Sequence, residues 1–135
     1  MTRLFLDANV LFTAAHNPHG KAAFLIALAA EGYWEVVTSP LAVEEAQRNL
    51  ARKYPSCLSR LADLLARITQ VPSGAGVHYP IPLPAKDRPI LEAAIGCAAT
   101  HLLTGDIKDF GPYMNQPEMC AGVMIQPVAQ FLDSL

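Results

Sequence analysis

The chain has 135 residues, of which 52% are hydrophobic and 16% charged, and its formal net charge is −2. This length predicts one domain over residues 1–135, and the composition is typical of a folded protein with a buried core rather than of a disordered chain. Apolar runs stop short of the roughly 18 residues that a membrane helix needs, and an acid stands too early, at position 7, for a signal peptide. We therefore expect neither a membrane segment nor a secretion signal.

The three cysteines, Cys57, Cys97 and Cys120, form no CxxC pair, and the four histidines show no spacing matched to them. We expect reduced core thiols in a cytoplasmic protein, and no zinc site. Charged residues are scarce and the mean hydropathy is +0.24. Since few charges are left to cover the surface, we expect an apolar patch used in self-association, most simply a homodimer.

The first predicted element is a strand over residues 3–7, because apolar residues fall on both of its faces, as in a buried parallel strand. Residues 16–20 form a turn cluster rich in Asn, Pro and Gly. An Ala- and Leu-rich helix is expected over 21–30, closed by Gly32 just beyond its end.

A second strand is predicted over residues 34–38. Ser39 followed by Pro40 is a helix start, a capping residue and then proline at the first helical position, and this helix is expected to reach about Lys53. The apolar spacing after Pro55 predicts another helix from residue 56 to about 69.

The stretch 71–86 is rich in proline and glycine and predicts an extended connection with one short strand at most. Asp87 stands at the N-cap position of a helix expected to run to about Thr100, and residues 101–104 follow as a third strand. A broken helical turn is expected over 107–114, because Gly-Pro interrupts it.

A last strand over residues 122–125 and a closing helix over 128–135 complete the chain. Alternating strands and helices predict an α/β fold, a three-layer α/β/α sandwich with a mainly parallel central sheet. In such folds ligands bind at the carboxyl ends of the strands, near a switch in strand order.

Acidic residues fall near that edge. Asp7 ends the first strand, Asp106 follows the strand 101–104, and Asp87 begins the helix that leads into that strand. A glutamate of the helix after Thr38 would come from the same edge. Converging carboxylates repel one another, and hard cations such as Mg²⁺ and Mn²⁺, which prefer oxygen ligands, resolve the repulsion. Such cations activate water and stabilise the oxygens of a phosphodiester during its cleavage.

Taken singly, some of these acids have structural interpretations. Asp87 could be only a helix cap, worth about 1 kcal/mol, and Asp106 and Asp109 could be turn or cap residues. Asp7 is harder to explain, since an acid at the end of a buried apolar strand lacks an evident partner. The joint pattern is more specific than any of its members.

Three stretches of the chain carry a resemblance to a known family. They are residues 4–11 (LFLDANVL), then 38–40 (TSP) with 45–50 (EAQRNL), then 87–94 (DRPILEAA) with 102–106 (LLTGD) and 109–110 (DF). In their order and spacing, and over roughly its whole length, the chain resembles the PIN-domain family, which includes the VapC-type toxins of toxin–antitoxin pairs.

The resemblance implies a ribonuclease that depends on Mg²⁺ or Mn²⁺, with an RNA substrate and, for a toxin, an antitoxin protein as partner. The metal-binding and catalytic acids that it implies are Asp7, Glu45, Asp87 and Asp106, with Asp109 as a further metal ligand. It also implies that Asn9, Ser39 and Thr104 orient these acids.

Either Glu44 or Glu45 could be the glutamate of this set of acids. Glu44 has Arg48 four residues later, which is a surface-pair arrangement, whereas Glu45 has Asn49 there. The family spacing favours Glu45, and Glu44 stays open as the alternative.

The net charge of −2 is unusual for a protein that binds nucleic acid through its phosphates. Bound metal cations, or basic residues gathered near the site, would have to offset the repulsion between this negative charge and the phosphates. The candidates for binding RNA lie on the elements that carry the acids: Arg48, Arg52, Lys53, Arg88 and Lys108. His16 and His19 fit ordinary loop residues better than phosphate ligands.

Other function classes fit less well. A haloacid-dehalogenase-type phosphatase needs a second aspartate two residues after Asp7, where Asn9 stands, and a response-regulator receiver needs a lysine beyond Lys108. A PIN-like module that binds RNA or a protein without cutting is the main alternative, and the presence of all four acids argues against it.

Overall fold

A five-stranded parallel sheet forms the centre of the chain in the computed structural model, which describes residues 1–72, 74 and 81–135. The strands are β1 (Arg3–Leu6), β2 (Glu35–Thr38), β3 (Thr69–Gln70), β4 (His101–Leu103) and β5 (Met124–Gln126). Their order across the sheet is β3-β2-β1-β4-β5, and every neighbouring pair is parallel. The predicted α/β class with a parallel sheet is confirmed.

Strand β1 lies in the middle of this sheet because its sequence has no polar face. Leu4, Phe5 and Leu6 are all completely buried. On either side of β1, Phe5 is in register with Val37 of β2 and Leu102 of β4. A fully buried Leu or Phe side chain contributes roughly 1.5–3 kcal/mol, so the short strand anchors the core although it has only four residues.

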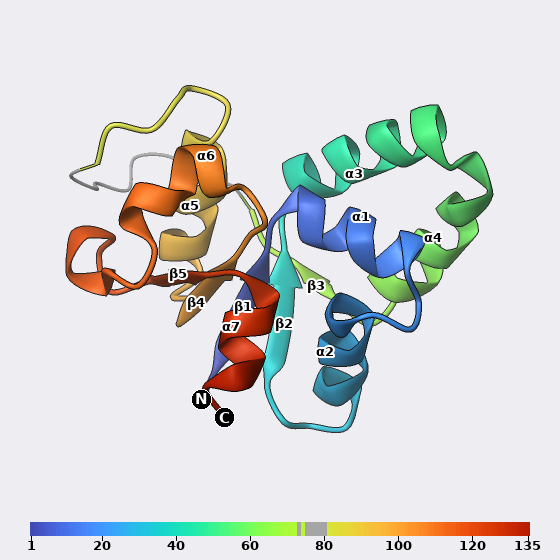
Figure 1. Ribbon diagram of the computed structural model, residues 1–135, viewed down its shortest axis with the longest axis horizontal. Helices are drawn as coiled ribbons and strands as arrows, with labels where there is room; N and C mark the ends of the chain where they lie inside the picture. Colours follow the sequence, from blue (N-terminus) through green and yellow to red (C-terminus); the bar gives the residue numbers. More distant parts are fainter. Residues whose placement is uncertain (73, 75–80) are drawn as a thin grey trace.

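Helices cover both faces of the sheet. They are α1 (Ala8–His16), α2 (Lys21–Ala30), α3 (Pro40–Lys53), α4 (Leu58–Leu65), α5 (Arg88–Gly96), α6 (Ile107–Phe110) and α7 (Val128–Asp133). The chain passes through α1 to α4 to reach β2 and β3, then returns across β1 through α5 to reach β4, so right-handed crossovers place α5 on the opposite face. Figure 1 shows α1, α3 and α4 on one side of the sheet and α5 and α6 on the other. This is the expected layered arrangement.

Helix α1 corrects the sequence-based interpretation, which places no helix between the first strand and the turn at 16–20. The Asp7 side chain caps the helix, since its Oδ1 accepts a hydrogen bond of 2.7 Å from the Ala8 amide. Leu11, Ala14 and Ala15 then recur at helical spacing and are fully buried. The segment is short and holds no acidic residue in its first turn, so only the cap and this spacing mark it in the sequence.

The helix expected over 56–69 ends earlier, because the chain enters the sheet. A 3₁₀ turn, η1 (Pro55–Cys57), precedes α4, which stops at Leu65, and Thr69–Gln70 forms the edge strand β3 beside β2. The short strand allowed for within 71–86 is absent from the described part of that stretch; residues 73 and 75–80 lie outside the described residues.

The remaining elements follow one another in the predicted order, but some of them end at other residues than predicted. Helix α5 stops at Gly96 rather than near Thr100, and Ala98 has a positive φ of 58° that no helix can continue through. The broken turn over 107–114 is α6 followed by the 3₁₀ turn η2 (Gly111–Tyr113). A further 3₁₀ turn, η3 (Pro117–Met119), was not predicted and precedes β5.

Gly32 closes α2 as predicted. Its φ is +91°, and the amides of Gly32 and Tyr33 donate to the carbonyls of Ala29 and Leu28. These two bonds form a Schellman motif, which requires a left-handed residue after the helix.

The three cysteines are free thiols. Cys120 is fully buried, and Cys57 and Cys97 are half-buried against the core, as expected for core thiols. Among the described helices none is both long and apolar enough to cross a membrane.

Candidate metal centre

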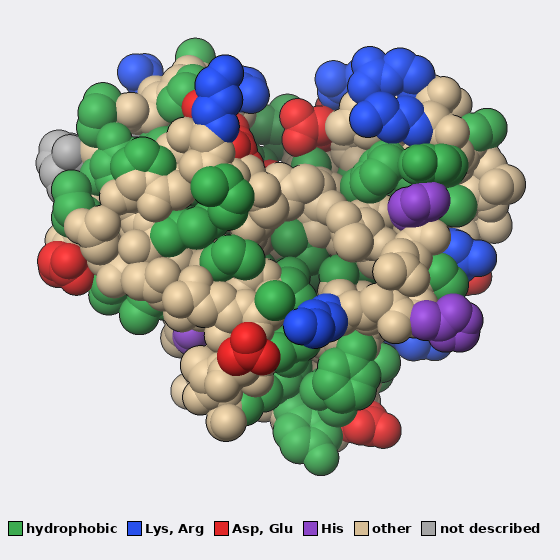
Figure 2. All heavy atoms as spheres, viewed as in Figure 1, with side chains coloured by type: hydrophobic (Ala, Val, Ile, Leu, Met, Phe, Trp, Pro, Cys, Tyr) green, Lys and Arg blue, Asp and Glu red, His purple; other side chains and the backbone are tan. Residues whose placement is uncertain are grey.

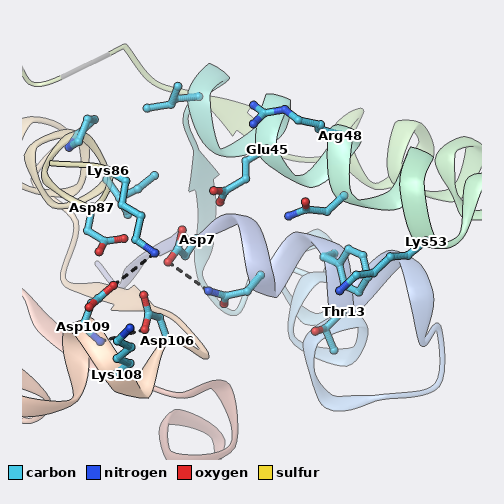
Figure 3. A pocket seen from close by; sticks show the side chains of 16 residues that line it. Asp7, Thr13, Glu45, Arg48, Lys53, Lys86, Asp87, Asp106, Lys108 and Asp109 are labelled. Carbon is cyan, nitrogen blue, oxygen red and sulfur yellow. Dashed lines mark hydrogen bonds and ion pairs between the residues drawn. The ribbon is translucent and has the colours of Figure 1, made fainter. Parts of the chain in front are cut away.

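A cavity of about 610 Å³ opens where β1 and β4 end. The strand order reverses between these two strands, since the chain leaves β1 for β2 and later returns to β4 on the other side. Such a switch point splays the flanking loops apart and is where open α/β sheets bind ligands. Helices α1 and α3 line one side of the cavity, and side chains from the segments 86–90 and 106–109 line the other (Figure 3).

Asp7 lies at the floor of this cavity and is 5% exposed. Besides capping α1, it accepts hydrogen bonds at Oδ2 from Thr104 Oγ1 at 2.8 Å and from Asn9 Nδ2 at 3.3 Å. Burial raises the pKa of Asp7, the bonds from Thr104 and the Ala8 amide oppose that rise, and the charges of Glu45 and Asp106 add to it. Asp7 is thus held in place, but its negative charge is only partly compensated.

Thr104 connects the two halves of the site. It is fully buried, and its hydroxyl oxygen accepts hydrogen bonds from Asn9 Nδ2 at 3.2 Å and from the Asp106 amide at 3.1 Å. Asn9 Oδ1 in turn accepts from the Gly105 amide at 2.7 Å. Asn9 and Thr104 therefore fix Asp7 against the loop that carries Asp106.

Asp87, Asp106 and Asp109 form a tight group, in which one carboxylate oxygen of each lies within 4.8 Å of the others. Asp106 Oδ1 accepts a hydrogen bond of 3.0 Å from the Asp109 amide at the start of α6. Asp87 stands at the N-cap position of α5 but makes no capping hydrogen bond with its side chain. Its interpretation as a mere helix cap is therefore wrong.

The carboxyl group of Asp87 is in an unusual environment. Asp87 is 7% exposed, and its buried Oδ2 has no hydrogen-bond partner. Burial, a hydrogen bond with the carboxyl group of Asp109 and the charges of Asp106 and Asp109 raise the pKa of Asp87 to about 7. The hydrogen bond from Asp87 lowers the pKa of Asp109, whose Oδ2 also lies 3.5 Å from Lys86 Nζ. Beyond the effect of burial, the raised pKa of Asp87 and the ion pair between Lys86 and Asp109 are both consequences of the negative charge that these three acids gather in one place.

Glu45 faces this group from α3 across the cavity (Figure 3), where it is exposed. Its negative charge acts on Asp7. Glu44 is not among the residues that line the cavity, and it pairs with Arg48 on the surface at 3.7 Å. The geometry therefore favours Glu45 over Glu44 as the acid of the site.

Ser39 has a different place from the one expected. Its hydroxyl caps α3 by accepting from the Ala42 amide at 3.2 Å, and it is not a lining residue of the cavity. It positions the helix that carries Glu45 rather than an acid directly. The neighbouring Thr38 donates a hydrogen bond of 2.8 Å to the Leu6 carbonyl and so ties the end of β2 to the end of β1.

Comparison with family models identifies the family of this chain. The PIN domain matches residues 3–108, which include Asp7, Glu45, Asp87 and Asp106. The chain belongs to the PIN-domain family. No curated protein matches this PIN domain in sequence.

Two solved structures share the fold of this PIN domain. VapBC2 from Rickettsia felis, bound to a DNA fragment from its promoter, matches with a TM-score of 0.65 at 19% identity, over 93% of this chain and 98% of that one. VapBC-1 from nontypeable Haemophilus influenzae matches with a TM-score of 0.57 at 16% identity, over 95% of this chain and 99% of that one.

The predicted RNA-binding cations divide into two groups in the PIN domain. Arg48, Lys53 and Lys108 line the cavity. Arg52 and Arg88 do not; Arg52 donates to Asn49 Oδ1 at 3.2 Å, and Arg88 donates to the Leu83 carbonyl at 3.1 Å.

Among the cavity-lining residues that sequence reasoning missed are four polar or aromatic ones, Phe12, Thr13, Asn49 and Lys86. Lys86 could have been noticed as the neighbour of Asp87. The other three lie on α1 and α3 at helical spacing from Asn9 and Glu45, so the helical period would have found them once α1 was recognised.

Proposed function

We propose that this PIN domain is an endoribonuclease that depends on Mg²⁺ or Mn²⁺, and that it is the toxin of a toxin–antitoxin pair. The observation that carries the proposal is the convergence of Asp7, Asp87, Asp106 and Asp109 at the switch point of the sheet, with Glu45 opposite. Few structural roles explain so many carboxylates in one cavity, because their mutual repulsion lowers the stability of the fold.

The donor set fits a hard divalent cation. All the groups are carboxylates, three of them have oxygens within 4.8 Å of one another, and Asp87 Oδ2 is buried without a hydrogen-bond partner. An oxygen in that state is accounted for if it binds a cation. Asp87, Asp106 and Asp109 would hold one ion, and Asp7 and Glu45 face the same space. When bound, the ion supplies a water of lowered pKa and positive charge beside a phosphate oxygen.

The protein's own residues have distinct tasks in this proposal. Asn9 and Thr104 keep Asp7 oriented through the hydrogen bonds to its Oδ2. Arg48, Lys53 and Lys108 stand at the cavity as cations that can bind RNA phosphates. These basic side chains, together with the metal ion, would allow a chain whose net charge is −2 to bind the negatively charged phosphates of RNA.

Incubation of the protein with labelled single-stranded and structured RNA, in Mg²⁺, Mn²⁺ or EDTA, tests the nuclease. Asp7→Asn serves as the inactive variant, checked for folding by circular dichroism. Cleavage that needs the metal and disappears in Asp7→Asn supports the proposal. Cation binding without cleavage of any RNA would favour the alternative, a PIN-like module that binds RNA or protein without cutting.

The toxin role is supported by the likeness to the two VapBC structures. It predicts that expression of the chain arrests growth and that co-expression of a small protein encoded beside it restores growth. Arrest that persists in Asp7→Asn would argue against a nuclease toxin. Self-association of the chain stays a prediction, which light scattering after gel filtration would test.

A further inference from the structure

A cluster of three aromatic rings begins at the wall of the cavity, which Phe12 lines, and includes His16 and Tyr54 beyond it. Phe12 and His16 come from α1, and Tyr54 is the residue that ends α3. The rings of His16 and Tyr54 are stacked, with centroids 3.9 Å apart and planes 16° apart. Phe12 is tilted against both, at 6.0 Å from His16 and 5.9 Å from Tyr54. We call these three residues the aromatic platform.

The aromatic platform is accessible. Tyr54 is 41% exposed, His16 is exposed, and Phe12 is half-buried with its ring at the wall of the cavity. A structural role in the core would bury these rings more completely, as it does for Phe5 and Phe110, which are both 0% exposed. The surface is thus available to a ligand.

Helix α1 holds the aromatic platform at a fixed distance from the acids. Phe12 and Thr13 come three and four residues after Asn9, and His16 comes four and three residues after them, so all four share one face of α1. With a rise of about 1.5 Å per residue, Phe12 stands roughly 7.5 Å along the helix from Asp7. The Asp7 cap and the Asn9 bond to the Gly105 amide anchor the start of α1 in the site.

Cations border the aromatic platform on the side of the cavity. Lys53 Nζ lies 5.9 Å from the centre of the Phe12 ring, and Arg48 stands five residues earlier on α3. Figure 3 shows Lys53 and Thr13 at the end of the cavity opposite Asp87 and Asp109. In Figure 2, basic side chains lie at the top of the part of the molecule formed by α1 and α3, and apolar side chains lie directly below them. Acidic side chains lie along the hollow between this part and the part formed by α5 and α6.

We propose that the aromatic platform stacks an unpaired base of single-stranded RNA while Arg48 and Lys53 bind the adjoining phosphates. A base would extend the stack that His16 and Tyr54 already form. The inference rests on the proposed nuclease function and specifies its substrate. Bases in a duplex are paired and already stacked, so aromatic side chains engage them only in single strands, loops or ends. Any base presents a π-face, so little sequence preference is expected from this contact.

Binding of fluorescein-labelled single-stranded RNA, followed by anisotropy in Mg²⁺ with Asp7→Asn as the parent protein, tests the aromatic platform without cleavage. Tyr54→Ala and Phe12→Leu should each raise Kd about 5- to 100-fold, and Tyr54→Trp should restore binding. Tyr33→Ala is the matched control, since Tyr33 is 66% exposed and belongs to the loop before β2. A 2-aminopurine base in the RNA should lose fluorescence on binding to the parent protein, and less to Tyr54→Ala.

The outcomes for stacking and for catalysis are separable. If Kd stays unchanged in Tyr54→Ala and Phe12→Leu while both remain folded, the stacking inference is wrong and the surface serves a protein partner instead. If Kd rises in both variants although the wild-type chain cuts no RNA, the aromatic platform is supported and the nuclease proposal fails. Equal binding of a duplex and a single strand of the same sequence would also overturn the inference.

Discussion

Thr104 donates a hydrogen bond of 2.8 Å to Asp7 Oδ2 although 97 positions separate them in the sequence. Each residue directly follows its strand, Asp7 after β1 and Thr104 after β4, and these two strands are neighbours in the sheet. The register of the sheet thus determines which hydroxyl supports which carboxylate. A shift of either strand by one residue would turn one of the two side chains to the other face.

Thr104→Val should lower the stability of the metal-free protein. The substitution keeps the shape of the side chain but leaves a buried carboxylate oxygen with only the 3.3 Å bond from Asn9. We expect a loss of about 1–3 kcal/mol in the free energy of unfolding, measured by urea denaturation in EDTA. Thr104→Ser, which retains the hydroxyl, should stay closer to the wild type. Equal stability of the Val variant and the wild type would mean that the bond contributes nothing.

Asp87→Asn should stabilise the metal-free protein in a pH-dependent way. The pKa of Asp87 is raised to about 7 in the folded protein, against about 3.9 when unfolded. The folded state therefore binds the proton more tightly, and the wild type loses stability as the pH rises from about 4 to 7. The advantage of Asp87→Asn should grow over that window to at most about 4 kcal/mol and stay constant above it.

Urea denaturation in EDTA at several pH values measures this difference. Asp63→Asn is the control, because it makes the same chemical change at an exposed acid of α4 that does not line the cavity. A difference between Asp87→Asn and wild type that does not change with pH would contradict the raised pKa.

Cation binding should release a proton. A metal ligand must be deprotonated, and Asp87 is about half protonated at neutral pH because its pKa is about 7. Affinity for Mn²⁺ or Mg²⁺ should therefore rise between pH 5 and pH 8, approximately tenfold per unit below pH 7 at most. Isothermal titration calorimetry in buffers of different ionisation enthalpy measures the proton release, which Asp87→Asn should abolish. Binding with no proton release at pH 6 would place the cation away from Asp87.

Glu45→Gln should reduce the rate of RNA cleavage far more than Glu44→Gln. Glu45 faces the cavity from α3, whereas Glu44 makes an exposed pair with Arg48 at 3.7 Å, and such surface pairs contribute about 0–1 kcal/mol. We expect a loss of roughly two orders of magnitude or more in kcat for Glu45→Gln and little change for Glu44→Gln. Steady-state cleavage of labelled RNA in Mn²⁺ measures both, and a reversed ranking would assign the site to Glu44.

The parts of the site that lie on the sheet could be predicted from the sequence. Asp7 and Asp106 follow short apolar runs, and parallel strands bring their carboxyl ends to one edge, so local pattern and topology agree. Asp87 was predicted at the same edge, but its unpaired Oδ2 depends on how the chain before α5 folds. No local pattern encodes that path.

The parts that depend on helix packing could not be predicted. Phe12 and Tyr54 meet only because α1 packs against α3, and α1 itself has few signals besides its cap at Asp7. Arg52 and Arg88 were chosen because they share elements with the acids, yet a side chain on the right helix need not line the cavity, and neither of these does.

The return of the chain across β1 has a consequence for its synthesis on the ribosome. Asp7 is made first, but its hydroxyl partner and the group of three aspartates arrive only with residues 87–109. A nascent chain that ends before β4 has β1 exposed on one side and an incomplete set of carboxylates. Because domains fold as units while they are synthesised, the full group of carboxylates is expected to assemble only after most of the chain has emerged, so the proposed nuclease would be inactive during most of its own synthesis.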